Sequence, residues 1–104
     1  MDYSVRIMRK AEQDLSEIVS YISETLMNSQ AASALLGEFQ RNADILKTSP
    51  YAFPVSFDPR LKEEGYHKFI FGKNFVSLYL IDDKEAEVSI MRIFYAKRDY
   101  PDLV

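Results

Sequence analysis

The apolar residues of this 104-residue chain change their spacing several times, and each spacing indicates a different element. Tyr3, Val5 and Ile7 alternate with polar residues, which predicts a strand that buries one face. Over residues 10–26, and again over residues 30–47, apolar residues recur at helical spacing. Because the break between these two stretches is short, we expect an antiparallel helical hairpin.

The second helix carries two further signals. Asn28 or Ser29 is expected to cap it, since both side chains accept hydrogen bonds from the free backbone amides at a helix start. Gly37 lies inside the helix and weakens it by roughly 1 kcal/mol relative to alanine. We expect Gly37 to permit close packing against the first helix.

Residues 48–64 have the composition of a loop. The three prolines Pro50, Pro54 and Pro59 exclude a regular helix interior or a central strand. Apolar side chains nevertheless recur at period two, at Tyr51, Phe53, Val55 and Phe57. We therefore expect an ordered loop that its aromatic residues pin to the core, with Leu61 on a short helical turn.

The last third of the chain contains three apolar runs separated by two short polar turns. The runs cover residues 66–71, 75–81 and 87–95, which predicts an antiparallel meander. The middle run is apolar on both faces, as is typical of a central strand. We predict an α+β fold in the order β-α-α-β-β-β, and the first strand joins the same sheet beside a partner that the sequence leaves open.

The expected core collects the inward-facing apolar residues of all these elements. It comprises Val5, Ile7, Leu15, Ile18, Val19, Ile22, Leu35, Leu36, Phe39, Leu46, Val76, Leu78, Leu80, Val88 and Ile90. The chain length fits a single domain over residues 1–104.

Composition narrows the possible functions. The net charge is −3, so the overall field does not attract nucleic acid, although a local cationic patch remains possible. The chain has no cysteine and one histidine, which argues against disulfides, thiolate chemistry and a metal site, and we expect no cofactor. The first residues lack the pattern of a signal peptide and no apolar run is long enough to span a membrane, so a cytoplasmic protein is expected.

Arg98 is the first candidate for a functional role. It follows the last apolar run, so its backbone should be anchored while its side chain reaches into solvent. A guanidinium in that position can grip a phosphate through two hydrogen bonds. The alternative is an ion pair with Asp99 or with an acidic segment of a partner.

His67 and Lys68 open the first strand of the meander. Histidine is the side chain best suited to proton transfer near neutral pH. A lone histidine without a matching partner motif is more often an ordinary edge-strand residue, and we favour that interpretation for His67.

Three further residues near the chain end are candidates for partner binding. Lys97 and Tyr100 flank Arg98, and a tyrosine beside cations can stack on a base or simply dock the tail, whereas packing is favoured for Tyr95. Arg92 interrupts an apolar strand face. Either that face opens to solvent, or a carboxylate meets the guanidinium, which a partner protein could provide.

The aromatic strand around Val76-Ser77-Leu78-Tyr79 and the closing run from Ile93 to Tyr100 resemble the RelE/ParE superfamily of toxins from type II toxin–antitoxin pairs, the plasmid stabilisation family. The resemblance covers nearly the whole chain and implies the predicted fold. RelE-type nucleases carry several basic residues in the meander. Here Phe69 stands where a second lysine is expected, and Val76 or Ser77 replaces an arginine.

The resemblance implies three alternative functions. A ParE-like toxin binds DNA gyrase and blocks its cycle without bond-making groups, and the incomplete cation set and the acidic balance favour it. A RelE-like toxin is a ribosome-dependent mRNA endonuclease, in which Arg98, His67 and Lys68 are catalytic. The third alternative is a non-toxic relative that still binds the antitoxin.

All three alternatives imply a cognate antitoxin, whose C-terminal segment wraps the toxin as it folds and forms a hetero-oligomer. We expect its apolar side chains to enter grooves between the helical hairpin and the sheet. The candidate binding residues for the antitoxin or the target are Arg92, Lys97, Arg98, Tyr100, Phe39, Phe57 and Phe71.

Overall fold

The computed structural model describes residues 2–104, and its elements follow the predicted order. The helices and helical turns are α1 (Arg9–Ser20), η1 (Tyr21–Thr25), α2 (Ser29–Ile45), α3 (Pro59–Glu63) and η2 (Pro101–Leu103). The strands are β1 (Ser4–Ile7), β2 (His67–Phe71), β3 (Phe75–Asp82) and β4 (Glu87–Tyr95). The predicted α+β fold, with a helical hairpin followed by a meander, is confirmed.

The four strands form one sheet in the order β1-β4-β3-β2. β2, β3 and β4 pair antiparallel, and Phe75 in β3 lies opposite Phe71 on one side and Tyr95 on the other. β1 pairs parallel with β4, from Ser4 opposite Glu87 to Ile7 opposite Ile90. This pairing supplies the partner of the first strand, and it leaves the part of β4 beyond Ile90 without a strand neighbour on that edge.

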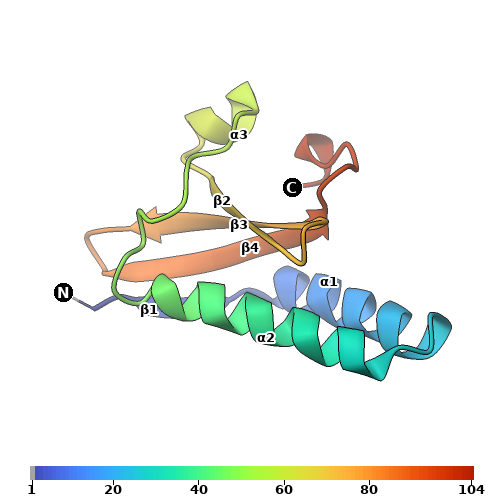
Figure 1. Ribbon diagram of the computed structural model, residues 1–104. Coiled ribbons are helices and arrows are strands. Elements are labelled where there is room, and N and C mark those ends of the chain that lie inside the picture. Colours follow the sequence, from blue (N-terminus) through green and yellow to red (C-terminus); the bar gives the residue numbers. More distant parts are fainter. Residues whose placement is uncertain (1) are drawn as a thin grey trace.

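The two faces of the sheet are covered by different parts of the chain (Figure 1). α1 and α2 lie against one face, which we call the inner face. α3 and the C-terminal turn lie on the opposite, outer face. Each face has its own cluster of buried residues. The inner cluster is built on Ala11, Leu15, Leu35, Phe39, Leu46, Phe69, Phe71, Tyr79, Val88, Ile90 and Ile93, and the outer cluster on Leu61, Tyr66, Val76, Leu78 and Phe94.

Most of the predicted core is confirmed as buried or half-buried, with one error. Ile7 is 41% exposed because it ends β1, the short strand at the edge of the sheet. Leu80, predicted for the core, is half-buried and packs in the outer cluster, whereas Val5, Ile18, Val19, Ile22 and Leu36 are half-buried against the inner one.

The helical hairpin begins and turns largely as predicted. The side chain of Asn28 accepts a hydrogen bond of 3.0 Å from the amide of Ala31, which confirms it as the cap of α2. The first helix does not remain α-helical to Leu26, because it changes after Ser20 to a π-helical turn in which the amide of Leu26 bonds Tyr21. The wider turn changes the helical register, and Leu26 projects into solvent.

Gly37 does not serve the close helix packing that we expected of it. A Cβ atom at this position would meet only the Arg41 side chain of its own helix, at 3.4 Å. Gly72 shows the opposite situation, because its φ is +59° and a Cβ atom there would overlap Leu35. The close approach between the hairpin and the sheet is therefore made at the β2–β3 turn.

The proline-rich loop is ordered, but its aromatic residues do not all point inward. Phe53 packs against Phe69 at a centroid distance of 5.3 Å, and Val55 forms an isolated bridge with His67. Asp58 caps α3 through the amides of Arg60 and Leu61, which confirms the expected short helical turn. Phe57 is 82% exposed, so this end of the loop presents an aromatic ring to solvent.

Candidate functional site

His67 is held within an aromatic cluster by contacts on several sides. Its Nδ1 atom lies 2.9 Å from the carbonyl oxygen of Phe53, and because a carbonyl only accepts, Nδ1 carries the proton. The imidazole stacks on Tyr79 at a centroid distance of 5.4 Å and meets the edge of Tyr51 at 5.5 Å. These contacts fit the favoured interpretation of His67 as a packed strand residue.

Lys68 faces away from His67, because successive residues of a strand point to opposite faces of the sheet. His67 shares the inner face with Phe69, whereas Lys68 lies on the outer face, with its Nζ atom 4.3 Å from the centroid of the Phe57 ring. The ammonium group is thus engaged in a cation–π contact. Two of the three predicted catalytic side chains therefore lie on different sides of the sheet.

Arg98 lies at the other end of the sheet. It follows Tyr95, which lies directly opposite Phe75 of β3, whereas His67 lies directly opposite Tyr79 of the same strand. Phe75 and Tyr79 are four residues apart along β3, which corresponds to about 13 Å. Arg98 is exposed and, within residues 2–104, has no ion-pair partner, Asp99 included. The predicted trio of Arg98, His67 and Lys68 is not brought together.

A groove lies between the hairpin and the end of β4, and Arg98 is on its rim. We call it the α1–β4 groove. Its volume is about 600 Å³, and it is lined by Asp14, Glu17, Ile18, Tyr21, Ile22, Phe75, Arg92, Ile93, Phe94, Tyr95 and Arg98. A second hollow of about 440 Å³ at the tip of the hairpin shares Ile22 and Phe75 with it. The two hollows form a mainly apolar surface with acidic residues from α1 on one side and Arg98 on the other.

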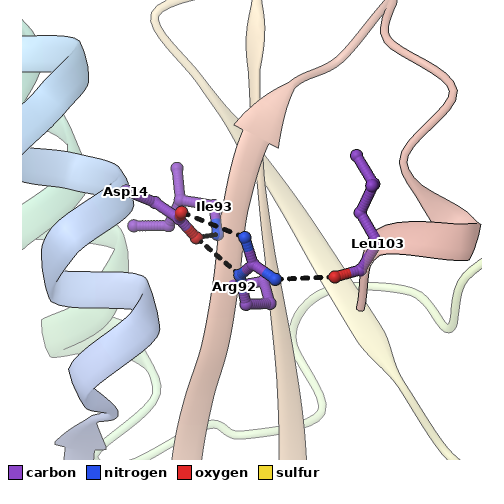
Figure 2. A network of polar contacts seen from close by, with 4 residues as sticks. All are labelled: Asp14, Arg92, Ile93 and Leu103. Atoms are coloured by element: carbon purple, nitrogen blue, oxygen red, sulfur yellow. Dashed lines mark hydrogen bonds and ion pairs between the residues drawn. The ribbon is translucent and has the colours of Figure 1, made fainter.

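Arg92 and Asp14 form the main polar contact of this groove (Figure 2). Asp14 accepts hydrogen bonds from Nε of Arg92 at 2.8 Å and from Nη2 at 3.2 Å. The same carboxylate accepts the backbone amide of Ile93 at 3.0 Å. Nη1 of Arg92 donates to the carbonyl oxygen of Leu103 at 2.6 Å, and the side chains of Arg92 and Asp14 are only 19% and 16% exposed.

The amide of Ile93 lies on the edge of β4 that β1 leaves uncovered. Met8 bonds the carbonyl oxygen of Ile90, after which the chain turns away into α1. Asp14 then supplies, from the second turn of α1, the acceptor that a neighbouring strand would otherwise provide. The hydrogen bonds from Arg92 to Asp14 raise the pKa of the arginine. The carboxylate suggested by the position of Arg92 thus belongs to the chain itself, and Arg92 is already paired with it in the free chain.

The other predicted binding residues divide into buried and accessible ones. Phe39 and Phe71 are both buried in the inner cluster, so the expectation that they line an open groove is wrong. Their rings pack on each other at 5.3 Å, edge to face. Phe57 and Lys97 are exposed, and Tyr100 stacks on Phe94 at 5.5 Å with an interplanar angle of 11°, which docks the tail.

Several residues of the groove were not among the candidates predicted from the sequence, namely Asp14, Tyr21, Phe75 and, as a groove residue, Ile22. Asp14 lies in the first helical stretch, where a lone acid carries no visible signal of its partner. The sequence did contain a signal at Arg92, because a cation that interrupts an apolar strand face implies either an opening to solvent or a carboxylate that meets it. Tyr21 carried no such signal, and it lies exposed in the π-helical turn that follows α1.

Two general properties of the described chain bear on function. Among residues 2–104, no three or more histidine, aspartate or glutamate side chains gather as a group that could hold a metal ion. No helix in that range is both long and apolar enough to cross a lipid bilayer.

Comparison with known proteins identifies similar sequences and folds. A family model described as the ParE toxin of the type II toxin–antitoxin system parDE matches residues 5–100. Among solved structures, the chromosomal ParDE toxin–antitoxin system from P. aeruginosa is similar, with a TM-score of 0.70, 18% identity, and coverage of 91% of this chain and 97% of that chain. No curated protein matches the chain significantly.

Two RelE structures share the fold at lower TM-scores. The toxin–antitoxin complex RelBE2 from Mycobacterium tuberculosis gives 0.57 at 22% identity, covering 91% of this chain and 99% of that one. A mutant of the E. coli toxin RelE in the free state gives 0.59 at 15% identity, covering 93% and 86%.

Proposed function

The chain belongs to the ParE toxin family of type II toxin–antitoxin systems, and we propose that it inhibits DNA gyrase through protein–protein contacts in the cytoplasm until an antitoxin neutralises it. The observation that carries this proposal is the separation of the candidate catalytic groups. His67 and Lys68 face opposite sides of the sheet, and Arg98 is at its other end. Binding to a protein target needs an exposed surface rather than converging acid and base groups.

The positions between these cations also support binding without catalysis. Phe69, Val76 and Ser77 are buried, so the places where RelE-type nucleases carry further basic residues hold no cation. Stabilising a charged phosphorane requires donors that converge on one point. The negative net charge of the chain also favours a protein target over the ribosome, because a ribosomal site is strongly anionic.

We infer that the α1–β4 groove and the adjoining hollow receive apolar side chains of an antitoxin. Ile22 and Phe75 contribute to both hollows, while Leu26 and Met27 at the hairpin tip are exposed. The structures from P. aeruginosa and M. tuberculosis are themselves described as toxin–antitoxin assemblies, which supports an antitoxin partner and a hetero-oligomer for this chain.

Gyrase inhibition is tested directly with purified components. The free toxin is added in excess to DNA gyrase and relaxed plasmid, and supercoiling is followed on agarose gels. We expect loss of supercoiling and accumulation of cleaved DNA, both prevented by prior addition of the antitoxin. Full supercoiling at saturating toxin would reject gyrase as the target.

A parallel assay separates the RelE-like alternative. Translating ribosomes are incubated with the toxin, and cleavage of the mRNA is mapped by primer extension. We expect no cleavage in this assay. Cleavage that disappears in the Arg98→Ala variant would instead support the nuclease. Induction in cells without the antitoxin tests the non-toxic alternative, since growth arrest with DNA damage excludes it.

A further inference from the structure

Arg92 contacts parts of the chain that lie on opposite sides of the sheet. Its Nε and Nη2 atoms bond Asp14 on α1, at the inner side, and its Nη1 atom bonds the carbonyl oxygen of Leu103 in the C-terminal turn. Its guanidinium carbon is also 4.5 Å from the centroid of the Phe94 ring. In Figure 2 the guanidinium accordingly lies between helix α1 on one side and the tail on the other.

The tail, residues 96–104, is attached at its start by the amide of Ala96, which donates to the carbonyl oxygen of Asn74 at 2.7 Å, and further along by two side-chain contacts on the outer face. Tyr100 stacks on Phe94, and Asp102 forms an ion pair of 2.6 Å with Arg60 of α3. Both members of this ion pair are mostly exposed, and surface pairs of this kind contribute little. The stack and the bond from Arg92 are therefore the contacts that hold the tail over Phe94.

The orientation of Arg92 depends on Asp14. A guanidinium is planar and its N–H groups point in fixed directions, so the two bonds to Asp14 set the plane in which Nη1 reaches Leu103. Asp14 is the only acid that bonds Arg92 in the described part of the chain. Without Asp14, the amide of Ile93 and the N–H groups at Nε and Nη2 of Arg92 lose their hydrogen-bond acceptor together.

We propose that the Asp14–Arg92 pair couples the α1–β4 groove to the C-terminal tail, so that breaking this pair in the groove loosens the tail and uncovers Phe94 on the outer face. Arg92 and Asp14 both line the groove, which places the pair within reach of a bound segment. The proposal rests on the proposed function only for the nature of the partner, because the coupling is a property of the isolated chain. A segment that binds in the groove and breaks the pair would thus change a surface that it does not touch.

The coupling is tested in the purified chain without antitoxin or gyrase. Asp14→Ala removes the carboxylate, and Glu17→Gln is the matched control, since Glu17 lines the same groove but its carboxylate makes no hydrogen bond or ion pair within residues 2–104. Three quantities are measured. They are amide exchange at Ile93, the nuclear Overhauser effect between the Tyr100 and Phe94 rings, and the rate at which a carboxypeptidase removes Val104 and Leu103.

For Asp14→Ala we expect faster exchange at Ile93, a weaker ring contact and carboxypeptidase trimming accelerated about tenfold, which corresponds to one charge-assisted hydrogen bond. Glu17→Gln should stay close to wild type in all three. Faster exchange at Ile93 with unchanged trimming and an unchanged ring contact would overturn the proposal, because the pair would then be broken without consequence for the tail. Failure of gyrase inhibition has no bearing on this result.

A second variant covers the case in which Asp14→Ala does not fold. Coupling is reciprocal, so a change in the tail must also reach the groove. Tyr100→Ala removes the stack on Phe94 and should raise amide exchange at Ile93 about fivefold, which corresponds to a coupling free energy at the low end of the typical range. Unchanged exchange at Ile93 in a Tyr100→Ala chain whose tail is trimmed faster would also overturn the proposal.

Discussion

The hydroxyl of Tyr79 donates a hydrogen bond of 2.9 Å to the carbonyl oxygen of Pro50. Both residues are buried, and the bond joins the central strand β3 to the start of the proline-rich loop. Burial raises the pKa of Tyr79, so the hydroxyl remains a donor throughout the accessible pH range. The loop is therefore anchored by a polar bond from the core as well as by the packing of Phe53.

Removing this hydroxyl should destabilise the protein measurably. Tyr79→Phe leaves the buried carbonyl of Pro50 without its donor, and we expect a loss of about 1–3 kcal/mol in the free energy of unfolding. Urea denaturation followed by circular dichroism measures it. Tyr51→Phe is the control at an exposed site and should lose less than Tyr79→Phe; equal losses would contradict the buried bond as the anchor.

Removing the hydroxyl of Ser77 should have the opposite effect on stability. Its Oγ atom is buried in β3 and is the only buried side-chain polar atom in residues 2–104 that lacks a hydrogen-bond partner. Ser77→Ala removes the orphaned hydroxyl and should leave stability unchanged or raise it by about 1 kcal/mol. Ser56→Ala is the matched variant and should destabilise, because the Ser56 hydroxyl accepts the amide of Asp58. Thermal unfolding of both variants tests the contrast.

Gly37, inside α2, and Gly72, in the β2–β3 turn beside α2, should respond differently to the same substitution. Gly37→Ala meets only ordinary contact with Arg41 inside a helix, so a gain of about 0.5–1 kcal/mol is expected. Gly72→Ala combines a positive φ with overlap onto Leu35 and should lose more than 1 kcal/mol. Denaturation midpoints decide between these outcomes. Destabilisation by Gly37→Ala would show a packing role that the present contacts do not contain.

Asp83 should give the stability of the protein an acid-sensitive component. Hydrogen bonds from Tyr51 and from Tyr3, the latter 2.7 Å long, lower the pKa of this carboxyl. A carboxyl whose pKa is lower in the folded than in the unfolded state stabilises the folded state at pH values above the unfolded pKa. This contribution is lost as the pH falls through the pKa of the folded state.

The free energy of unfolding of wild type should therefore exceed that of Asp83→Asn at pH 7. The difference should shrink as the pH falls below about 4, the ordinary value of an aspartate, and passes through the lower pKa that Asp83 has in the folded state. Urea titrations over this range measure the difference. A difference independent of pH would contradict the role of the carboxylate charge.

Charge reversal at Arg98 tests the rim of the α1–β4 groove as a binding surface. Arg98→Glu should keep the melting temperature, since the side chain is exposed, but should weaken antitoxin or gyrase binding about tenfold or more. Lys84→Glu makes the same charge change in the exposed turn at the opposite end of β4 and is the control. Equal binding by both variants, measured by calorimetry, would remove Arg98 from the interface.

The fold was largely predictable from local patterns. Alternation and helical spacing located all four strands and both long helices, because burial of one face imposes these periods on neighbouring residues. The cap at Asn28 was visible because its side chain can accept a hydrogen bond from a free amide at the helix start, which is also a local property. Predictions that depended on three-dimensional surroundings were less accurate, as Ile7, Gly37, Phe39 and Phe71 show, since exposure is set by which element covers a residue.

The sequence by itself determined the order of the elements, the two-faced apolar sheet and the cationic exit of its last strand. These features depend on side chains close together in the chain, whose spacing records which face is buried. Only the tertiary structure decided that β1 pairs with β4 and that Asp14 meets Arg92, 78 positions away. Such contacts form between single residues that the chain path brings together, and one carboxylate or one guanidinium carries no periodic signal of its partner.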